Sequence, residues 1–362
     1  CITADDVMAK LRMGMYVQAR YGSAWLSLPN YLPQVLESGV DTRLILLCTD
    51  DNHPNTLVNE GGMDRALRAV LECGCDPVTA LQFATINAAQ CLGVDQDMGS
   101  ITPGKCADMV ILPDLETFIP EQVYIDGDLV AQDGKATFDH DLFEWPEFMT
   151  HTMNVGRTFT AADFEIPVDR PDGMCRVRAI GGVGGSTITE DAVIEVPVVD
   201  GKLQANPAID ALKMAVFDRH HGAEGTHSFG FCTGFGVHGA LAQTVAHDSH
   251  NLLVVGDNDE DMALAAQTLV ECGGGEVAVQ DGRVLALVEL PVCGLMSDKH
   301  VEEVAQEVAA IEQAWSDMGC KMPSPFMTMG ILSLPCVPVL RLTNRGYVNC
   351  LTFQFEDLLV EE

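Results

Sequence analysis

The sequence lacks several features that would mark out a class of protein. Its 362 residues hold 20 Lys and Arg against 53 Asp and Glu, so the net charge is -33 and the pI is about 4.4. A chain this acidic repels nucleic acid and anionic membranes. No apolar run reaches the ~18 residues that a membrane helix needs. Residues 1–16 lack the basic segment and apolar core of a signal peptide. We therefore expect a cytoplasmic protein with neither nucleic-acid nor membrane partners.

Cysteine pairs at metal-binding or redox spacing are also missing. The chain has 13 cysteines, an odd number, and Cys73-Gly-Cys75 is a C-x-C rather than a C-x-x-C. We expect reduced thiols, most of them buried as small apolar groups.

Hydrophobic patterning divides the chain into regions that differ in their predicted helices and strands. The first region predicts an α/β alternation of helix, strand, helix, strand and helices over 3–13, 16–24, 28–39, 42–48, 61–74 and 76–93. Short strands with glycine turns follow over 99–112 and 123–136, then a linker over 139–154. From about 155 the pattern predicts an α+β domain, with strands over 175–180, 191–199, 251–256, 283–292, 337–349 and 350–355 and helices over 259–274 and 299–319.

The first candidate site is the stretch LILLCTDDNHP over residues 44–54. A continuous apolar strand of this kind is typical of a parallel sheet buried on both faces, and it runs directly into Asp50 and Asp51. Active sites of (β/α)8 barrels lie at the carboxyl ends of the strands. Asp-Asp-Asn also suits a turn or a helix cap, and the local sequence favours that simpler interpretation.

The second candidate site is the stretch AHDSHNLLVVG over residues 246–256. It places His247, Asp248, His250 and Asn251 in one turn before an apolar strand, and these residue types can bind a divalent metal. A polar turn explains the same pattern at least as well. The glycine-rich stretches 181–187 and 234–239 contain no Lys and are interpreted as turns. His220, His221 and His227 are interpreted as surface or core residues, with a role beside the substrate as the alternative.

Two sets of motifs carry a family resemblance. Gly99, Pro103-Gly104-Lys105, Ala107-Asp108 and Asp126-Gly127 resemble the tail of the amidohydrolase superfamily, where the chain leaves a (β/α)8 barrel and completes a small β-sandwich. The stretches GFCTGFGVHGALAQTVAHDSHN and LPVCGLMSD resemble the C-terminal domain of the adenine deaminase family. The stretches CITADDVMAKLRMGMYVQARYGSAW and CTDDNHPNTLVNEGGMD fit the barrel of the same family.

The resemblance implies an α/β fold in three parts. Residues 1–93 would be the C-terminal end of a (β/α)8 amidohydrolase barrel, residues 94–150 a small β-sandwich segment and linker, and residues 151–362 an α+β C-terminal domain. The strand before Asp50 would be the eighth barrel strand. Asp50 would then be the general acid/base and a possible metal ligand, with Asp51 as the less favoured alternative.

The activity implied is hydrolysis of adenine to hypoxanthine and ammonia in purine salvage. A divalent metal, Mn²⁺ or Fe²⁺ in a binuclear site, would activate water, and the protein would be a homo-oligomer. The turn of His247, Asp248, His250 and Asn251 would lie near the barrel mouth, so His250→Ala should lower adenine turnover. The alternatives are another cyclic amidohydrolase and a non-catalytic purine-binding or oligomerisation module.

The family's metal ligands are largely missing from this sequence. The superfamily places an His-x-His on the first barrel strand, yet the chain has no His-x-His and no histidine before Asp50. A complete barrel takes ~250 residues, and only 49 precede Asp50. We therefore expect a C-terminal part of the enzyme, in which 1–93 fold poorly alone and 155–362 fold independently. Equal protection of both regions in limited proteolysis would contradict this.

Overall fold

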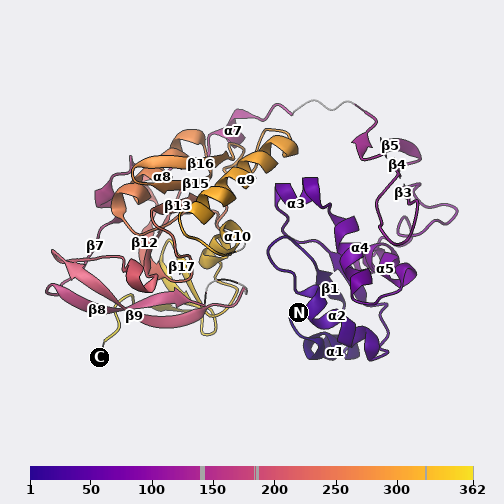
Figure 1. The fold of residues 1–362 in the computed structure, drawn as a ribbon, viewed down its shortest axis with the longest axis horizontal. Helices are drawn as coiled ribbons and strands as arrows, with labels where there is room; N and C mark the ends of the chain where they lie inside the picture. Colours follow the sequence, from indigo (N-terminus) through magenta and orange to yellow (C-terminus); the bar gives the residue numbers. More distant parts are fainter. Residues whose placement is uncertain (139–142, 183, 185–186, 323, 362) are drawn as a thin grey trace. The chain divides into compact units, whose positions relative to one another are not determined.

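The computed structural model describes residues 1–138, 143–182, 184, 187–322 and 324–361. The chain divides into two compact units, Cys1–Asp141 and Leu142–Glu362, which are described one at a time (Figure 1). Part of the expected linker and three residues of the glycine-rich stretch 181–187 lie outside the described residues. Across the described part of the chain, no helix has both the length and the apolar character needed to span a membrane.

The first unit begins with helices around a parallel pair of strands. The pair is β1 (Val17–Arg20) and β2 (Ile45–Cys48), aligned so that Val17 faces Ile45 and Arg20 faces Cys48. The helices are α1 (Ala4–Arg12), α2 (Leu28–Glu37), α3 (Pro54–Asn59), α4 (Met63–Glu72), α5 (Pro77–Ala84) and α6 (Ile86–Leu92). One apolar core joins these elements, because strand residues such as Ala19 and Leu47 pack with helix residues such as Leu32 and Phe83. The α/β alternation predicted from the sequence is confirmed.

One local prediction in this region was wrong, and one short helix was missed. The single helix expected over 76–93 is two helices, because Thr85 leaves the helical region at φ -127° and ψ -93°. Its hydroxyl donates to the Leu81 carbonyl at 2.6 Å, a local bond that competes with helix continuation. Helix α3 was not predicted, although Pro54 stands at its first turn, where proline costs no hydrogen bond.

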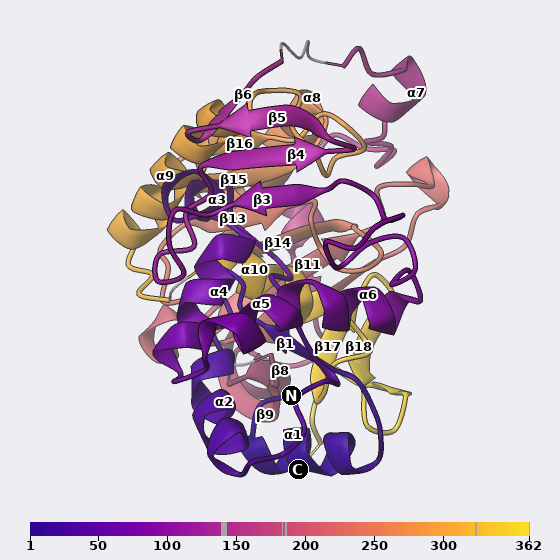
Figure 2. The ribbon, with the colours of Figure 1, turned by 90° about the vertical axis from the view of Figure 1, so that its right-hand side faces the viewer.

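The first unit ends in a four-stranded antiparallel sheet (Figure 2). Its strands are β3 (Met109–Ile111), β4 (Gln122–Ile125), β5 (Asp128–Gln132) and β6 (Lys135–Ala136). Asp126 and Gly127 join β4 to β5 with φ of 52° and 88°, as a two-residue hairpin turn of the primed type requires. The hairpin is confirmed, while the strand expected over 99–112 is confined to its last residues.

The second unit is built on a ten-stranded sheet in the order β16-β15-β13-β14-β11-β12-β8-β9-β10-β7. The strands are β7 (Ile166–Pro167), β8 (Gly173–Gly181), β9 (Glu190–Val199), β10 (Lys202–Leu203), β11 (Leu212–Phe217), β12 (His227–Cys232), β13 (Ala240–Gln243), β14 (Leu252–Gly256), β15 (Gly275–Gln280) and β16 (Arg283–Glu289). Only β8 and β12 pair in parallel among these neighbours. The sequence predicted β8, β9, β14 and β16 but not β11, β12, β13 or β15.

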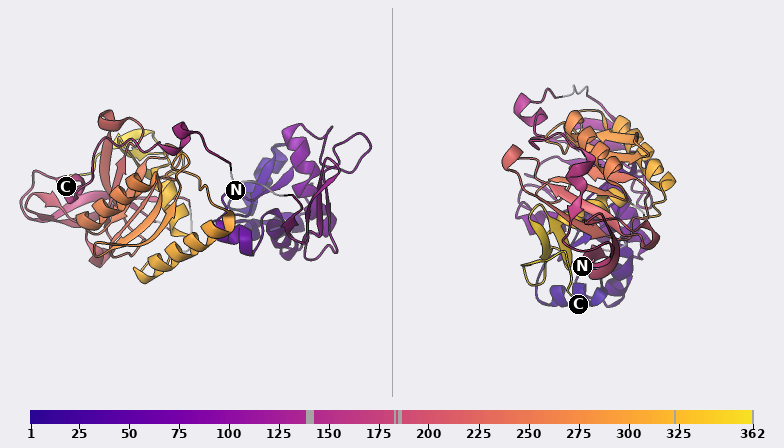
Figure 3. Two further views of the ribbon diagram at one scale, coloured as in Figure 1. Left: turned by 90° about the horizontal axis from the view of Figure 1, so that it is seen from above. Right: turned by 90° about the vertical axis from the view of Figure 1, so that its left-hand side faces the viewer.

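Two long helices cover opposite faces of this sheet (Figures 1 and 3). Strand β11 is buried throughout, and its residues alternate between two cores: Met214 packs with α9 (Val301–Asp317) and Ala215 with α8 (Asp259–Cys272). Side chains of a strand point alternately to the two faces of the sheet. A strand that is apolar on both faces therefore lies between two layers of helix.

The remaining elements complete the second unit. They are α7 (Glu147–Thr150), α10 (Pro325–Gly330), the 3₁₀ turns Ala161–Phe164, Pro207–Ile209, Gly222–Glu224 and Ile331–Ser333, and a three-stranded sheet of β17 (Leu340–Thr343), β18 (Gly346–Asn349) and β19 (Gln354–Glu356). The small sheet is bonded to the large one through the buried Tyr347, whose hydroxyl accepts from the Phe231 N–H at 2.6 Å.

Candidate functional site

The first candidate site lies at the carboxyl ends of β1 and β2. Because these strands are parallel and in register, their last residues, Arg20 and Cys48, lie side by side. Asp50 follows two residues after β2, at φ 58°, a left-handed conformation that aspartate tolerates better than most residues. The parallel pairing therefore brings Arg20 and Asp50 to one edge.

Both oxygens of the Asp50 carboxylate have a partner. Oδ2 accepts from Arg20 Nη1 at 2.9 Å, and Oδ1 accepts from the backbone N–H of Asp51 at 3.0 Å. The Arg20 guanidinium lies 5.3 Å from the centre of the Trp25 ring, within the range of a cation–π contact. The side chains of Arg20 and Asp50 are 29% and 41% exposed, so water and small solutes reach the carboxylate.

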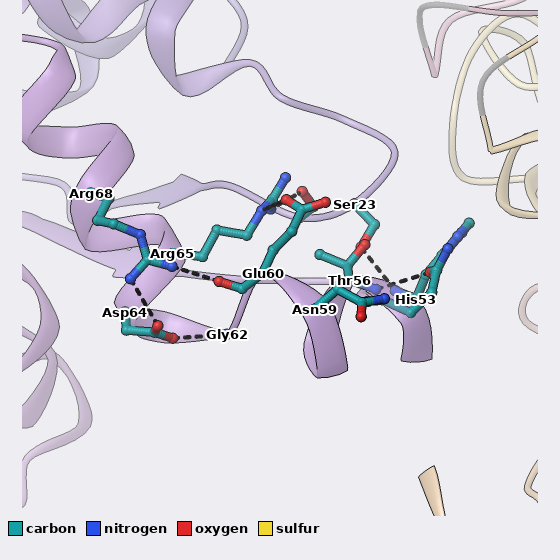
Figure 4. Close-up of polar contacts among 11 residues, drawn as sticks. Ser23, His53, Thr56, Asn59, Glu60, Gly62, Asp64, Arg65 and Arg68 are labelled. Carbon is teal, nitrogen blue, oxygen red and sulfur yellow. Dashed lines mark hydrogen bonds and ion pairs between the residues drawn. The ribbon is translucent and has the colours of Figure 1, made fainter. Parts of the chain in front are cut away.

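The loop after β1 is bonded to the loop after β2. Ser23 donates its N–H to the Asp51 carbonyl at 3.0 Å and accepts the His53 N–H on its hydroxyl at 2.8 Å (Figure 4). A Cβ on Gly22 would lie 2.7 Å from the carbonyl oxygens of both Thr49 and Asp51, so only glycine fits this approach. These contacts fix the backbone on either side of Asp50.

Two arginines of α4 donate hydrogen bonds to neighbouring segments of the chain (Figure 4). Arg65 bonds to the Gly22 carbonyl at 2.9 Å and to Glu60 Oε2 at 2.6 Å. Arg68 bonds to Asp64 Oδ2 at 2.9 Å and to the Glu60 carbonyl at 2.5 Å. Helix α4 thereby connects the segment after β1 with the end of α3.

The second candidate site is the turn between β13 and β14 in the second unit. The rings of His247 and His250 meet edge to face with centroids 5.5 Å apart, and His250 has a left-handed backbone at φ 49°. The His247 N–H donates to the Gly330 carbonyl at 2.9 Å. Asp248 Oδ1 lies 3.8 Å from His247 Nδ1, with a side chain that is 78% exposed. The structure thus places the four predicted residues of this turn together.

A buried arginine supports this turn. Arg219 is 1% exposed and donates to the carbonyls of His250 at 2.5 Å and Cys293 at 2.8 Å. Beside it, His250 Nδ1 and Asn251 Oδ1 are buried without a hydrogen-bond partner. Buried polar atoms without partners are rare in folded proteins, so these two atoms are an unusual feature of the turn.

Burial sets the direction of the resolved pKa shifts at both sites. Burial lowers the pKa of His250, and the nearby His247 and Arg219 lower it further. Burial also raises the pKa of the Cys48 thiol, with a smaller contribution from the charge of Asp50. The neutral forms of both groups are therefore favoured.

The described residues were also considered as ligands of a metal ion. Within the described residues, no three His, Cys, Asp or Glu side chains gather closely enough to hold a metal ion. Asp50 offers one carboxylate, and Arg20 already compensates its charge. The two candidate sites lie in different units.

Sequence reasoning found Asp50 but missed its neighbours. Arg20 and Gly22 stand in the stretch ARYGSAW, which overlaps the strand predicted over 16–24. Had the pairing of this strand with the next been known, both residues would have been placed beside Asp50. Arg219 adjoins the histidines that were considered over 218–231, but nothing in the sequence marks it as buried.

Comparison with known proteins gives matches over both units. Residues 186–354 match the adenine deaminase C-terminal domain, and residues 30–130 match the amidohydrolase family. An adenine deaminase of Clostridium botulinum (strain 657 / Type Ba4) is 48% identical over 99% of this chain and 60% of its own length. Those of Moorella thermoacetica and Roseobacter denitrificans are 45% and 42% identical, over 98% and 97% of this chain and 60% and 58% of their own.

The chain therefore spans about three fifths of the length of these relatives. A solved amidohydrolase from Thermotoga maritima MSB8 shares 23% identity over 36% of this chain and 42% of its own, with a TM-score of 0.27, and it supports no statement about the fold. The comparisons agree with the resemblance drawn from the sequence: residues 186–354 are similar to the adenine deaminase C-terminal domain, and nearly the whole chain is similar to part of the adenine deaminases.

Proposed function

We propose that the protein acts as an adenine deaminase in purine salvage, converting adenine and water to hypoxanthine and ammonia. The observation that carries this proposal is the similarity of nearly the whole chain, at 48% identity, to proteins that bear this name. The match of residues 186–354 to the adenine deaminase C-terminal domain supports it against other cyclic amidohydrolases. A non-catalytic module is not favoured by either comparison.

Asp50 is the residue proposed to carry the proton. It would accept a proton from the attacking water and pass it toward the leaving amine, as a general base and then a general acid. Its place just beyond β2, its exposure and its two fixed oxygens suit that role. We further propose that residues 1–93 are the end of a (β/α)8 barrel, and the parallel pairing of β1 with β2 supports this.

A divalent metal is part of the proposal, because the amidohydrolase match suggests metal dependence. We propose Mn²⁺ or Fe²⁺, in a binuclear site, which would lower the pKa of bound water. Among the described residues no three potential ligands gather, and Asp50 is the residue that we propose as a ligand. The two proposed proton transfers are therefore assigned to Asp50 and not to the metal.

The remaining predictions concern the surroundings of the site. We propose that the turn of His247, Asp248, His250 and Asn251 shapes the adenine site, and that the protein is a cytoplasmic homo-oligomer. The buried unpaired atoms of His250 and Asn251 support a role for the turn beyond folding.

The test is ammonia and hypoxanthine release from adenine by the protein expressed from its complete reading frame. We expect turnover that falls sharply but stays measurable in Asp50→Asn and falls less in His250→Ala. Asp41→Asn is the matched control, since Asp41 also pairs with an arginine but lies before β2. Full activity of Asp50→Asn would contradict the role of Asp50, and no turnover with adenine would contradict the function itself.

A further inference from the structure

Arg20 contacts the Asp50 carboxylate, and the fold holds it there. It is the last residue of β1, whose register with β2 fixes where its side chain begins. Its guanidinium is also held over the Trp25 ring. An arginine that is fixed at both its base and its tip loses little freedom when it binds a carboxylate.

The position of Asp50 makes such a partner necessary. Asp50 lies in a short segment beyond the end of β2, in a left-handed conformation, and its side chain is partly exposed. The N–H of Asp51 donates to Oδ1 of Asp50, whereas Oδ2 accepts from Arg20. Without Arg20, the carboxylate would keep one local bond and could rotate about its side-chain torsions.

We propose that Arg20 is a positioning residue for Asp50, holding Oδ2 so that the carboxylate faces the substrate in one orientation. This inference rests on the proposed function, in which Asp50 carries the proton. Arg20 acts through Asp50 and is not itself a catalytic residue. A misplacement of about 1 Å at a reacting group can cost about 100-fold in rate, so the loss of Arg20 should lower kcat and leave KM nearly unchanged.

The decisive experiment is a cycle of Arg20→Gln, Asp50→Asn and the double variant, with kcat and KM measured for adenine on the protein from its complete reading frame. If Arg20 acts through Asp50, the double variant should be no slower than Asp50→Asn, because residues that act as a unit are not additive. Arg20→Lys should recover part of the lost kcat, since lysine keeps the charge without the planar fork.

The chain provides a matched control. Arg43 pairs with Asp41 at 2.5 Å, and both side chains are exposed, at 83% and 56%. This second Arg–Asp pair precedes β2, whereas Arg20 and Asp50 lie at its carboxyl end. Arg43→Gln should leave kcat and KM as they are.

A second readout does not depend on activity. The amide proton resonance of Asp51 reports the bond to Asp50 Oδ1, so it should shift in Arg20→Gln and stay in place in Arg43→Gln. An unmoved Asp51 resonance, or additive effects of Arg20→Gln and Asp50→Asn on kcat, would overturn the role of Arg20 while leaving the proposed function intact. An unchanged protein that releases no ammonia from adenine would overturn the proposed function and, with it, this role.

Discussion

Gly22 lies where the loop after β1 passes against the loop after β2. A Cβ at this position would come within 2.7 Å of two backbone carbonyl oxygens, those of Thr49 and Asp51. Backbone atoms cannot rotate away as a flexible side chain can. We therefore predict that Gly22→Ala lowers the free energy of unfolding by about 1–3 kcal/mol, the usual cost of overpacking, and weakens the order around Asp50.

Chemical denaturation would measure this change, with Gly62→Ala as the control. The nearest atom to a Cβ on Gly62 is a side-chain carbon of Leu57 at 3.7 Å, which is ordinary contact. Equal stability of the two variants would show that the loops after β1 and β2 do not hold each other.

The neutral state of His250 predicts a dependence of stability on pH. Burial, His247, Arg219 and His220 lower the pKa of this histidine, and only Asp248 opposes them. The folded pKa therefore lies below the unfolded value of about 6.5. The stabilisation is complete above the unfolded pKa and is lost as the pH falls toward the folded pKa, because the unfolded chain binds the proton more readily.

Thermal unfolding between neutral and mildly acidic pH would measure this loss. In His250→Asn the melting temperature should fall less steeply on acidification, since asparagine does not titrate and tolerates the left-handed backbone. The melting temperature of His250→Asn should still fall somewhat with pH, because burial also lowers the pKa of His227. His151→Asn is the control, since His151 is exposed, and an identical slope in His250→Asn and the unchanged protein would refute the prediction.

At the scale of elements, helix α5 depends on Asp76, the residue that caps its N-terminus. The Asp76 carboxylate accepts the N–H groups of Val78 and Thr79, each at 3.1 Å, and Pro77 fits the first turn. We predict that Asp76→Ala destabilises the first unit by about 1 kcal/mol. Ser27 begins α2 without a side-chain bond, so Ser27→Ala is the control and should have little effect in the same denaturation experiment.

At the scale of the whole molecule, the net charge of -33 predicts stabilisation by salt. Like charges repel within a folded chain, and the screening length falls from about 30 Å at 0.01 M salt to about 3 Å at 1 M. The melting temperature should rise with sodium chloride over this range. An uncharged osmolyte at equal osmolality is the control. If the melting temperature rises equally in that solution, the cause is exclusion of the solute from the protein surface and not screening of the charges.

Several helices, one hairpin and the family resemblance could be predicted from local sequence patterns. Local periodicity and capping residues predicted the helices that begin at Thr3 and Asp76 and the hairpin at Asp126-Gly127, because these features depend on neighbouring residues. Family-specific motifs predicted a resemblance to the adenine deaminases, and the comparisons found the same similarity. The break at Thr85 was missed because the apolar pattern continues through it.

Only the tertiary structure decided what surrounds the candidate residues. Arg20 and Asp50 are 30 residues apart, and nothing local to either shows the register that brings them together. Strands β11 and β12 were missed because Lys213 interrupts the apolar run of β11 and β12 lies in a stretch rich in histidine and glycine. Long-range pairing and burial depend on the whole chain, and for that reason the partners of Asp50 and the burial of Arg219 could not be read from the sequence.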